Sequence, residues 1–330
     1  MTLGLTPPRA AACLIAAAFS WANAAQADPL PRFALPVDCT LGQDCFLQQY
    51  VDHDPGPGTR ELTCGDQTYD GHKGTDFALA TEADLARHVG VLAIAPGRVT
   101  ATRSDMKDGT YDRDAPEALG GRDCGNGLIL EHEGGWTSQY CHMAEGSITL
   151  APGDTVTTGT PLGRIGLSGR TEFPHLHLTL RHEGRVVDPF APDGVTGCDR
   201  PPEATLWAPD TSATTGGVMD LGFAPLVPEY DAIRAGTAPR DVTAEAPALV
   251  LWAFAHGGRQ GDVIELEITG PQGQIIRHRA LLKKSQSRLF RAAGKKRKTD
   301  RWPPGTYLGR ATHWRGDQMI GQRDTRFILP

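Results

Sequence analysis

From Asp76 onward the chain is a succession of short apolar segments separated by glycine- and proline-rich turns, and helical periodicity is nearly absent. Gly134-Gly135 separates two such segments, residues 127–133 and 136–142, and this pattern predicts a β-hairpin. One short helix is expected within residues 81–89. Strands joined by turns this short pair antiparallel. The sequence therefore predicts a mainly β protein.

The chain has 330 residues, enough for about two domains. Its texture changes near Pro201-Pro202, where a stretch rich in Ala, Pro, Thr and Gly begins, and again where short alternating strands resume. Those later strands predict a small β-sandwich. The expected segments are a signal peptide at 1–27, an irregular N-terminal wrap at 28–64, a first β domain at 65–200, a linker at 201–245 and a sandwich-like accessory domain at 246–330.

The N-terminus has the features of a secretory signal peptide. Arg9 precedes an apolar run at residues 11–19, and two small-residue cleavage patterns follow, Ala22-Asn23-Ala24 and Ala25-Gln26-Ala27. The apolar run is too short to be a permanent membrane span, and we expect no transmembrane segment later in the chain. The protein is therefore expected to be exported, to the periplasm or the extracellular medium.

The cysteine count fits an exported protein with disulfide bonds. One of the seven cysteines, Cys13, lies in the signal peptide, so six remain. Cys39 and Cys45 are close enough in sequence to close a local loop, but the pairing as a whole stays open. A cysteine-zinc site is not expected because CxxC spacing is absent. The six cysteines are Cys39, Cys45, Cys64, Cys124, Cys141 and Cys198.

The net charge of −6 argues against a nucleic-acid partner. One basic cluster nevertheless occurs near the C-terminus. It is either a solvated strand pair and loop or a surface that attracts anionic envelope polymers. Its members are Lys283, Lys284, Arg288, Arg291, Lys295, Lys296, Arg297 and Lys298.

Zinc-ligand residue types occur in two short segments far apart in the chain. The first holds His72 and Asp76, and the second holds His175 and His177. Residues two apart on a strand point to the same face, so both imidazoles of the second segment project into one site. Zinc binds imidazole nitrogen and carboxylate oxygen, and a catalytic zinc site has three protein ligands and one open position. His72, Asp76 and one histidine of the second segment make such a set.

Five segments in this order resemble the lysostaphin-like zinc endopeptidases, which cleave peptide bridges and stems of bacterial cell walls. The resemblance covers roughly residues 65–192, including a closing Val187-Asp188-Pro189, and identifies the first β domain as the peptidase domain. The segments are His72 to Asp76, Gly125-Asn126-Gly127, Tyr140-Cys141-His142, Gly153-Asp154-Thr155-Val156-Thr157-Thr158-Gly159, and His175-Leu176-His177.

The resemblance implies one Zn²⁺ per chain, bound by His72, Asp76 and His177, in a groove of an antiparallel β-sheet core. It makes His142 and His175 the catalytic histidines that do not bind the metal. A histidine can take a proton from water and return it to a leaving amine. His175 is the better candidate for this base because its strand ties it to His177. His142 then stabilises the oxyanion or orients the water, although the two roles are interchangeable at this stage.

The expected function is hydrolysis of peptide bonds in peptidoglycan cross-links or bridges. Two alternatives stay open: a non-catalytic activator of other wall hydrolases, and a zinc protease of Gly-rich proteins. All five site positions are filled, which favours an enzyme. Thr75 and Tyr140 are weak candidates to orient the ligands, and Ser168 is by default a turn residue. An N-terminal acidic or histidine side chain such as His53 is a further candidate to block the metal.

Overall fold

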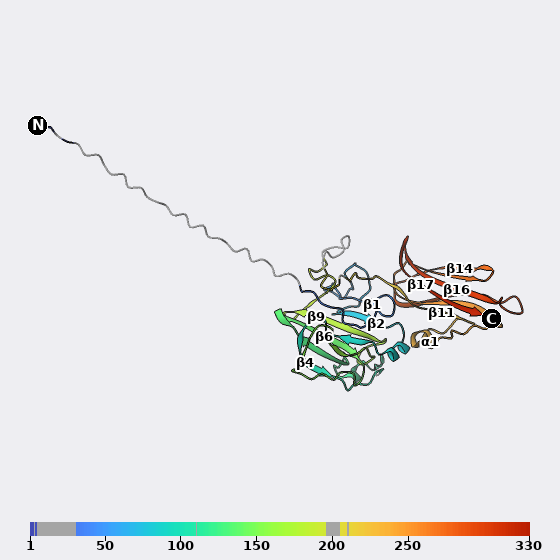
Figure 1. The fold of residues 1–330 in the computed structure, drawn as a ribbon, viewed down its shortest axis with the longest axis horizontal. Helices are drawn as coiled ribbons and strands as arrows, with labels where there is room; N and C mark the ends of the chain where they lie inside the picture. The colour runs from blue at the N-terminus through green and yellow to red at the C-terminus, as the bar shows by residue number, and fades with distance from the viewer. Residues whose placement is uncertain (3, 5–30, 110, 196–204, 210) are drawn as a thin grey trace. The chain divides into compact units, whose positions relative to one another are not determined.

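The structure, a computed structural model, is mainly β with antiparallel sheets, as the sequence predicts (Figure 1). It describes residues 1–2, 4, 31–109, 111–195, 205–209 and 211–330. Most of the expected signal peptide and Cys198 lie outside these residues. Arg32–Pro330 forms one compact unit, separate from Met1–Pro31.

An eight-stranded antiparallel sheet forms the centre of the N-terminal half. Its strand order is β1-β2-β9-β6-β5-β4-β7, and β10 pairs with β9. β3 and β8 form a separate two-stranded sheet. The strands are β1 Phe46–Gln49, β2 Thr75–Ala78, β3 Gly90–Leu92, β4 Gly97–Arg103, β5 Asn126–Glu131, β6 Trp136–Met143, β7 Thr155–Val156, β8 Pro161–Arg164, β9 His175–His182 and β10 Arg185–Val187.

The face of this sheet opposite the histidines is packed into an apolar core. Leu176, Leu178 and Leu180 of β9 are all buried there, while the residues between them point to the other face. The predicted hairpin at Gly134-Gly135 is present as β5 and β6. The expected helix within 81–89 is a 3₁₀ helix, η1, at Glu82–Arg87.

Two further sheets form the C-terminal half, one of order β11-β12-β15 and one of order β14-β13-β16-β17. Their inner faces share one core, which includes Leu251 of β12, Leu266 of β13 and Tyr307 of β16. This agrees with the expected sandwich. The elements are β11 Gly217–Ala224, α1 Tyr230–Ala235, β12 Ala248–Gly258, β13 Val263–Gly270, β14 Gly273–Leu281, β15 Gln286–Lys296, β16 Gly305–Arg315 and β17 Gln318–Leu329.

β11 and α1 lie in the stretch that the sequence suggested was a linker. β11 pairs with β12 along its whole length and is buried at all but one position. A third core joins the outer face of the three-stranded sheet to the N-terminal half. It contains Phe46 of β1, Ala80, Ile233 of α1, and Trp252 and Phe254 of β12.

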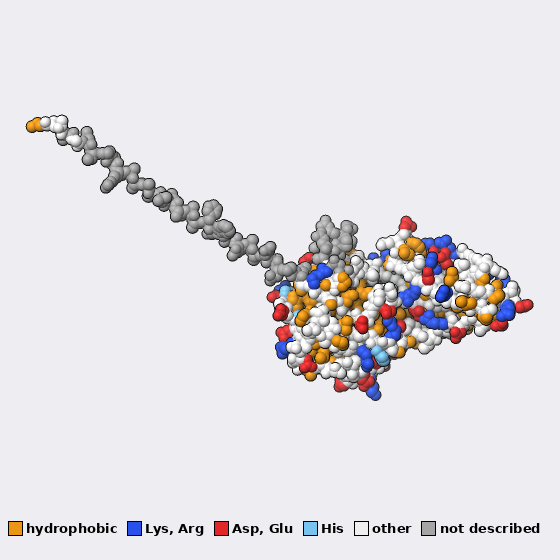
Figure 2. Space-filling view, viewed as in Figure 1, with side chains coloured by type: hydrophobic (Ala, Val, Ile, Leu, Met, Phe, Trp, Pro, Cys, Tyr) orange, Lys and Arg blue, Asp and Glu red, His pale blue; other side chains and the backbone are white. Residues whose placement is uncertain are grey.

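Disulfide bonds constrain the described part of the chain. Cys39 bonds to Cys45, as expected, and Cys124 bonds to Cys141. Cys64 is disulfide-bonded as well. Over the face shown in Figure 2, acidic and basic side chains of the described residues are intermixed. Among the described helices, none has the length and apolar character needed to cross a membrane.

Candidate metal centre

Strand register brings the two ligand-bearing segments together. His72 lies in the loop before β2, and Asp76 is the second residue of that strand. β2 pairs with β9 so that Asp76 lies opposite His177. On the other side of β9, Cys141 of β6 also lies opposite His177, which places His142 at the same end of the sheet.

Three potential ligand atoms face one another at this point: Nε2 of His72, Oδ1 of Asp76 and Nδ1 of His177. The distance from Nε2 of His72 is 3.2 Å to the Asp76 oxygen and 3.0 Å to the His177 nitrogen. The His177 nitrogen lies 2.9 Å from the Asp76 oxygen. Tetrahedral ligands about 2.0–2.1 Å from zinc are themselves about 3.3 Å apart, so the three atoms have nearly the required spacing.

The remaining ring nitrogens orient these ligands. Nδ1 of His72 donates to the Tyr50 carbonyl at 2.6 Å, so its Nε2 carries the lone pair. Nε2 of His177 lies 3.0 Å from the hydroxyl oxygen of Thr179, and we assign the proton to this nitrogen. Two lone pairs and a carboxylate oxygen within hydrogen-bonding distance repel one another unless a cation lies between them. The donor set therefore fits a divalent metal such as zinc.

The electrostatics around these three ligand atoms also favour a bound cation. Burial alone would raise the pKa of Asp76, but its contacts with the imidazoles of His72, His175 and His177 hold that pKa well below its ordinary value. Burial alone would lower the pKa of His72, but the Asp76 carboxylate outweighs this and raises it. The carboxylate is therefore ionised and ready to bind a cation.

Two further histidines lie beside the ligands. The ring centroids of His142 and His175 are 4.7 Å apart, and those of His142 and His177 are 6.0 Å apart. Burial lowers the pKa of His175 and, with the neighbouring imidazoles, lowers that of His142 well below its ordinary value. Both rings are therefore neutral near pH 7.

Backbone carbonyls fix the tautomers of these two rings. Nδ1 of His142 donates to the Ser168 carbonyl at 2.8 Å, and Nδ1 of His175 donates to the Phe173 carbonyl at 2.9 Å. Each ring therefore has an unprotonated Nε2. That of His175 lies 3.5 Å from Oδ1 of Asp76, at the edge of the ligand set. A basic nitrogen in this place is what general base catalysis requires.

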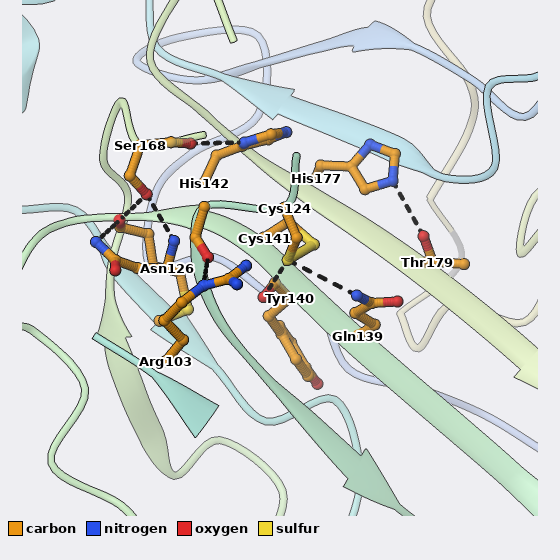
Figure 3. The surroundings of a disulfide bond; sticks show 12 residues. Arg103, Cys124, Asn126, Gln139, Tyr140, Cys141, His142, Ser168, His177 and Thr179 are labelled. Carbon is orange, nitrogen blue, oxygen red and sulfur yellow. Dashed lines mark hydrogen bonds between the residues drawn. A yellow bond between two sulfur atoms is a disulfide. The ribbon is translucent and has the colours of Figure 1, made fainter. Parts of the chain in front are cut away.

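His142 has a backbone conformation that is unusual for a residue with a side chain, with φ of 63°. It follows Cys141, which is bonded to Cys124, and its own N–H donates to the Cys124 carbonyl at 2.8 Å (Figure 3). Such conformations cost about 1–3 kcal/mol and persist where the surroundings impose them. The disulfide is part of what imposes this one.

A buried polar network holds the loop that carries the Ser168 carbonyl (Figure 3). The Ser168 hydroxyl accepts a hydrogen bond from the Asn126 N–H at 2.9 Å and donates to the Met143 carbonyl at 2.7 Å. The Asn126 side-chain amide donates to the carbonyls of Met106 and Met143. Ser168 is thus more than the turn residue that the sequence suggested, since it positions His142.

The orienting residues differ from those suggested by the sequence. The hydroxyl of Thr75 is buried and has no hydrogen-bond partner in the part of the chain that the structure describes, and that of Tyr140 bonds to the Ile94 N–H and to Ser138 within the core. Thr179 and Tyr50 contact the ligands instead. Thr179 could have been found from the sequence, because it lies two residues after His177 on the same strand face.

The N-terminal wrap does not place His53 in the metal centre. Its ring Nε2 lies 2.8 Å from a carboxylate oxygen of Asp188. The neighbouring Asp52 accepts hydrogen bonds from the N–H groups of Asp54, Arg60 and Gly71. These contacts hold the wrap and the Gly71 loop in place beside the first ligand segment.

Residues 70–189 match peptidase family M23, and all five site residues lie within this range. This part of the chain is thus similar to an M23 peptidase domain. The resemblance noted from the sequence motifs is thereby confirmed.

Two curated relatives from Vibrio cholerae serotype O1 show the extent of the M23 similarity. Peptidoglycan DD-endopeptidase ShyB is 27% identical over 122 residues, which cover 37% of this chain and 23% of the relative. Peptidoglycan DD-endopeptidase ShyA is 27% identical over 117 residues, 36% of this chain and 22% of the relative. The chain thus matches less than a quarter of the length of either relative.

Among solved structures, the catalytic domain of lysostaphin from Staphylococcus simulans matches with 22% sequence identity and a TM-score of 0.27. The match covers 43% of this chain and 85% of that domain.

Proposed function

We propose that this chain is an exported zinc endopeptidase that hydrolyses peptide bonds in bacterial peptidoglycan. The observation that carries the proposal is the cluster of three ligand atoms within 3.2 Å of one another, beside two neutral histidines. The Vibrio relatives, named as peptidoglycan endopeptidases, support the substrate class. The signal-peptide features of residues 1–27 support export.

His72, Asp76 and His177 would hold the zinc. When bound, zinc acidifies a water molecule to a pKa of about 7 and polarises the scissile carbonyl. Three protein ligands leave one position open for this chemistry. The Tyr50 carbonyl and the Thr179 hydroxyl keep both imidazoles in the tautomer that the site needs.

We assign the general base to His175. Its Nε2 is unprotonated and close to the ligand set, so it can accept a proton from the attacking water and return it to the leaving amine nitrogen. The Phe173 carbonyl stabilises the imidazolium that forms in between, because it accepts a hydrogen bond from Nδ1 in both protonation states.

His142 orients the water in this proposal. Its Nδ1–H donates to Ser168, so a neutral ring has no second N–H with which to stabilise an oxyanion. Its free Nε2 can accept a hydrogen bond from water. The structure therefore favours the orienting role over oxyanion stabilisation, the two roles left open by the sequence.

The proposal can be separated from its two alternatives by digestion. Purified peptidoglycan and a Gly-rich protein are incubated side by side with wild type, His177→Ala and His175→Ala, and the products are analysed by mass spectrometry. We expect wild type alone to release peptides from peptidoglycan. Loss of His175 should lower kcat by about 10²–10⁴-fold while zinc is retained.

Each alternative predicts a different pattern. A non-catalytic activator would give identical products from wild type and His177→Ala. A protease of Gly-rich proteins would cut the protein and leave peptidoglycan intact. Either pattern would refute the proposed substrate or the enzymatic role.

The structure divides the C-terminal basic cluster instead of gathering it on one surface. Lys283 and Lys284 precede β15, whereas Lys295, Lys296 and Lys298 lie at or beyond its other end. Arg288 donates to backbone carbonyls of the N-terminal half. Attraction to anionic polymers therefore does not form part of the proposal.

A further inference from the structure

Arg288 of the C-terminal half reaches into the peptidase sheet. It lies on β15, and its Nη2 donates to the carbonyl oxygens of Leu79 at 3.1 Å and Ala80 at 2.7 Å. These carbonyls directly follow β2, the strand that carries Asp76. One side chain of the C-terminal half therefore binds the residues that follow the C-terminal end of a ligand-bearing strand.

The rest of the Arg288 guanidinium is covered by two aromatic rings. Its Cζ lies 4.7 Å from the ring centroid of Phe173 and 4.9 Å from that of Phe254. Its Nε and Nη1 atoms are buried and have no hydrogen-bond partner among the described residues. The cation is thus engaged with ring faces and backbone, where it is held in place and shielded from dissolved anions.

Phe173 in turn contacts the general base. Its ring stacks on the imidazole of His175, with centroids 4.4 Å apart and an interplanar angle of 26°. Its carbonyl accepts the Nδ1–H of His175. Between them, the Pro174 carbonyl accepts the Leu79 N–H at 2.9 Å, so Arg288 and His175 are joined by a continuous set of contacts.

A second cation from the C-terminal half supports the same segment. Arg234 of α1 donates from Nη1 to the Glu172 carbonyl at 3.2 Å and pairs with Glu82 at 3.2 Å. The segment before β9 is therefore held from its far side at two consecutive residues, 172 and 173. Ala80 shares a buried hydrophobic core with Trp252 and Phe254, which joins the two halves of the molecule in this region.

We propose that Arg288 is a positioning residue for the peptidase reaction, which acts through Phe173 to fix the imidazole of His175. It gives the accessory domain a role in catalysis: β15 supports the segment that carries the base. The inference rests on the proposed function, because peptide hydrolysis is one of its readouts.

The test compares Arg288→Met, which keeps length and apolar contact, with Arg288→Lys, which keeps the charge, and with Phe173→Leu. Arg291→Met is the matched control, because Arg291 lies on the same strand and, among the described residues, its side chain donates only to Phe290 and Gln286 of its own half. The full-length zinc-loaded enzymes are assayed for kcat, KM and zinc content. The histidine ring resonances are recorded by NMR, with that of His175 assigned from His175→Ala.

We expect Arg288→Met to lower kcat by roughly ten- to a hundredfold with KM and zinc content nearly unchanged, since small displacements of a catalytic group cost this much. Arg288→Lys should recover part of the loss. The Arg288→Met and Phe173→Leu effects should be non-additive, because both act through one contact chain. The His175 resonances should shift in both variants, and Arg291→Met should match wild type.

The outcomes separate this inference from the proposed function. An inactive wild type would refute the proposed function, while the NMR comparison would still test the contact chain. An active wild type with unchanged kcat and unchanged His175 resonances in Arg288→Met would overturn the inference. A change confined to KM would also overturn it. So would an equal decrease of zinc content and of melting temperature in Arg288→Met and Arg288→Lys, because that result would indicate a purely structural residue.

Discussion

At the scale of the residue, the metal centre is a set of four imidazoles. Each is held by a hydrogen bond to the ring nitrogen that is not proposed to bind metal or water. Backbone carbonyls fix three of the rings, and the hydroxyl of Thr179 fixes the fourth, His177. A hydroxyl can be removed by substitution, whereas a carbonyl cannot. Thr179 is therefore the position where ligand orientation can be tested directly.

Replacing Thr179 by Val should weaken zinc binding by about 10–100-fold, because an orienting hydrogen bond to a ligand is lost at nearly constant volume. Thr179→Ser keeps the hydroxyl and should bind zinc almost as wild type does. Competition with a fluorescent zinc chelator measures both affinities. Equal affinities for the Val and Ser variants would show that this contact does not orient the ligand.

His256, outside the metal centre, makes stability depend on pH. Burial, together with the nearby His313 and Arg288, lowers its pKa to about 3. An unfolded histidine has a pKa of about 6.5, so below that pH the unfolded chain takes up a proton that the folded chain excludes. Stability contributed by neutral His256 is therefore complete above about pH 6.5 and is lost as the pH falls towards 3.

The loss should amount to about 1.4 kcal/mol of unfolding free energy per pH unit within that window. His256→Gln should remove this slope, and replacement of the exposed His278 by Gln should leave it in place. Denaturant unfolding at several pH values between 6.5 and 4.5 measures the difference. Parallel pH profiles for wild type and His256→Gln would contradict the assignment.

At the scale of the element, the ends of β5 and β6 are shaped for the site. The bond between Cys124 and Cys141 and the hydrogen bond from His142 to Cys124 hold His142, a proposed catalytic residue, in a left-handed backbone conformation. The hydrophobic pattern of β6 accounts for the strand. The disulfide helps to hold His142 in a backbone conformation that is not that of a strand. Removing the bond should therefore affect catalysis as well as stability.

The double variant Cys124→Ser/Cys141→Ser opens a loop of sequence separation 17. Loss of this constraint should lower the free energy of unfolding by about 3 kcal/mol, and kcat should fall while zinc stays bound. The matched Cys39→Ser/Cys45→Ser variant removes a bond outside the site and should keep wild-type kcat. If both double variants kept wild-type kcat, the disulfide would have no role in placing His142.

At the scale of the whole molecule, the sequence predicted what is local or periodic. Histidines two apart on β9 and the glycine hairpin of β5 and β6 have clear patterns, and the family motifs indicated the five site residues. β11 was missed because it is buried on both faces and so lacks strand alternation. The contact of Arg288 with Phe173 joins residues that are distant in sequence, and no local pattern encodes it.

The central claim is that one zinc ion is held by His72, Asp76 and His177. Calorimetric titration of zinc into the chelator-stripped protein tests it most directly, with Asp76→Ala and His175→Ala alongside wild type. We expect wild type and His175→Ala to bind one zinc per chain and Asp76→Ala to bind none at the same concentrations. A wild type that takes up no zinc, or an Asp76→Ala variant that binds it as tightly as wild type, would contradict the account.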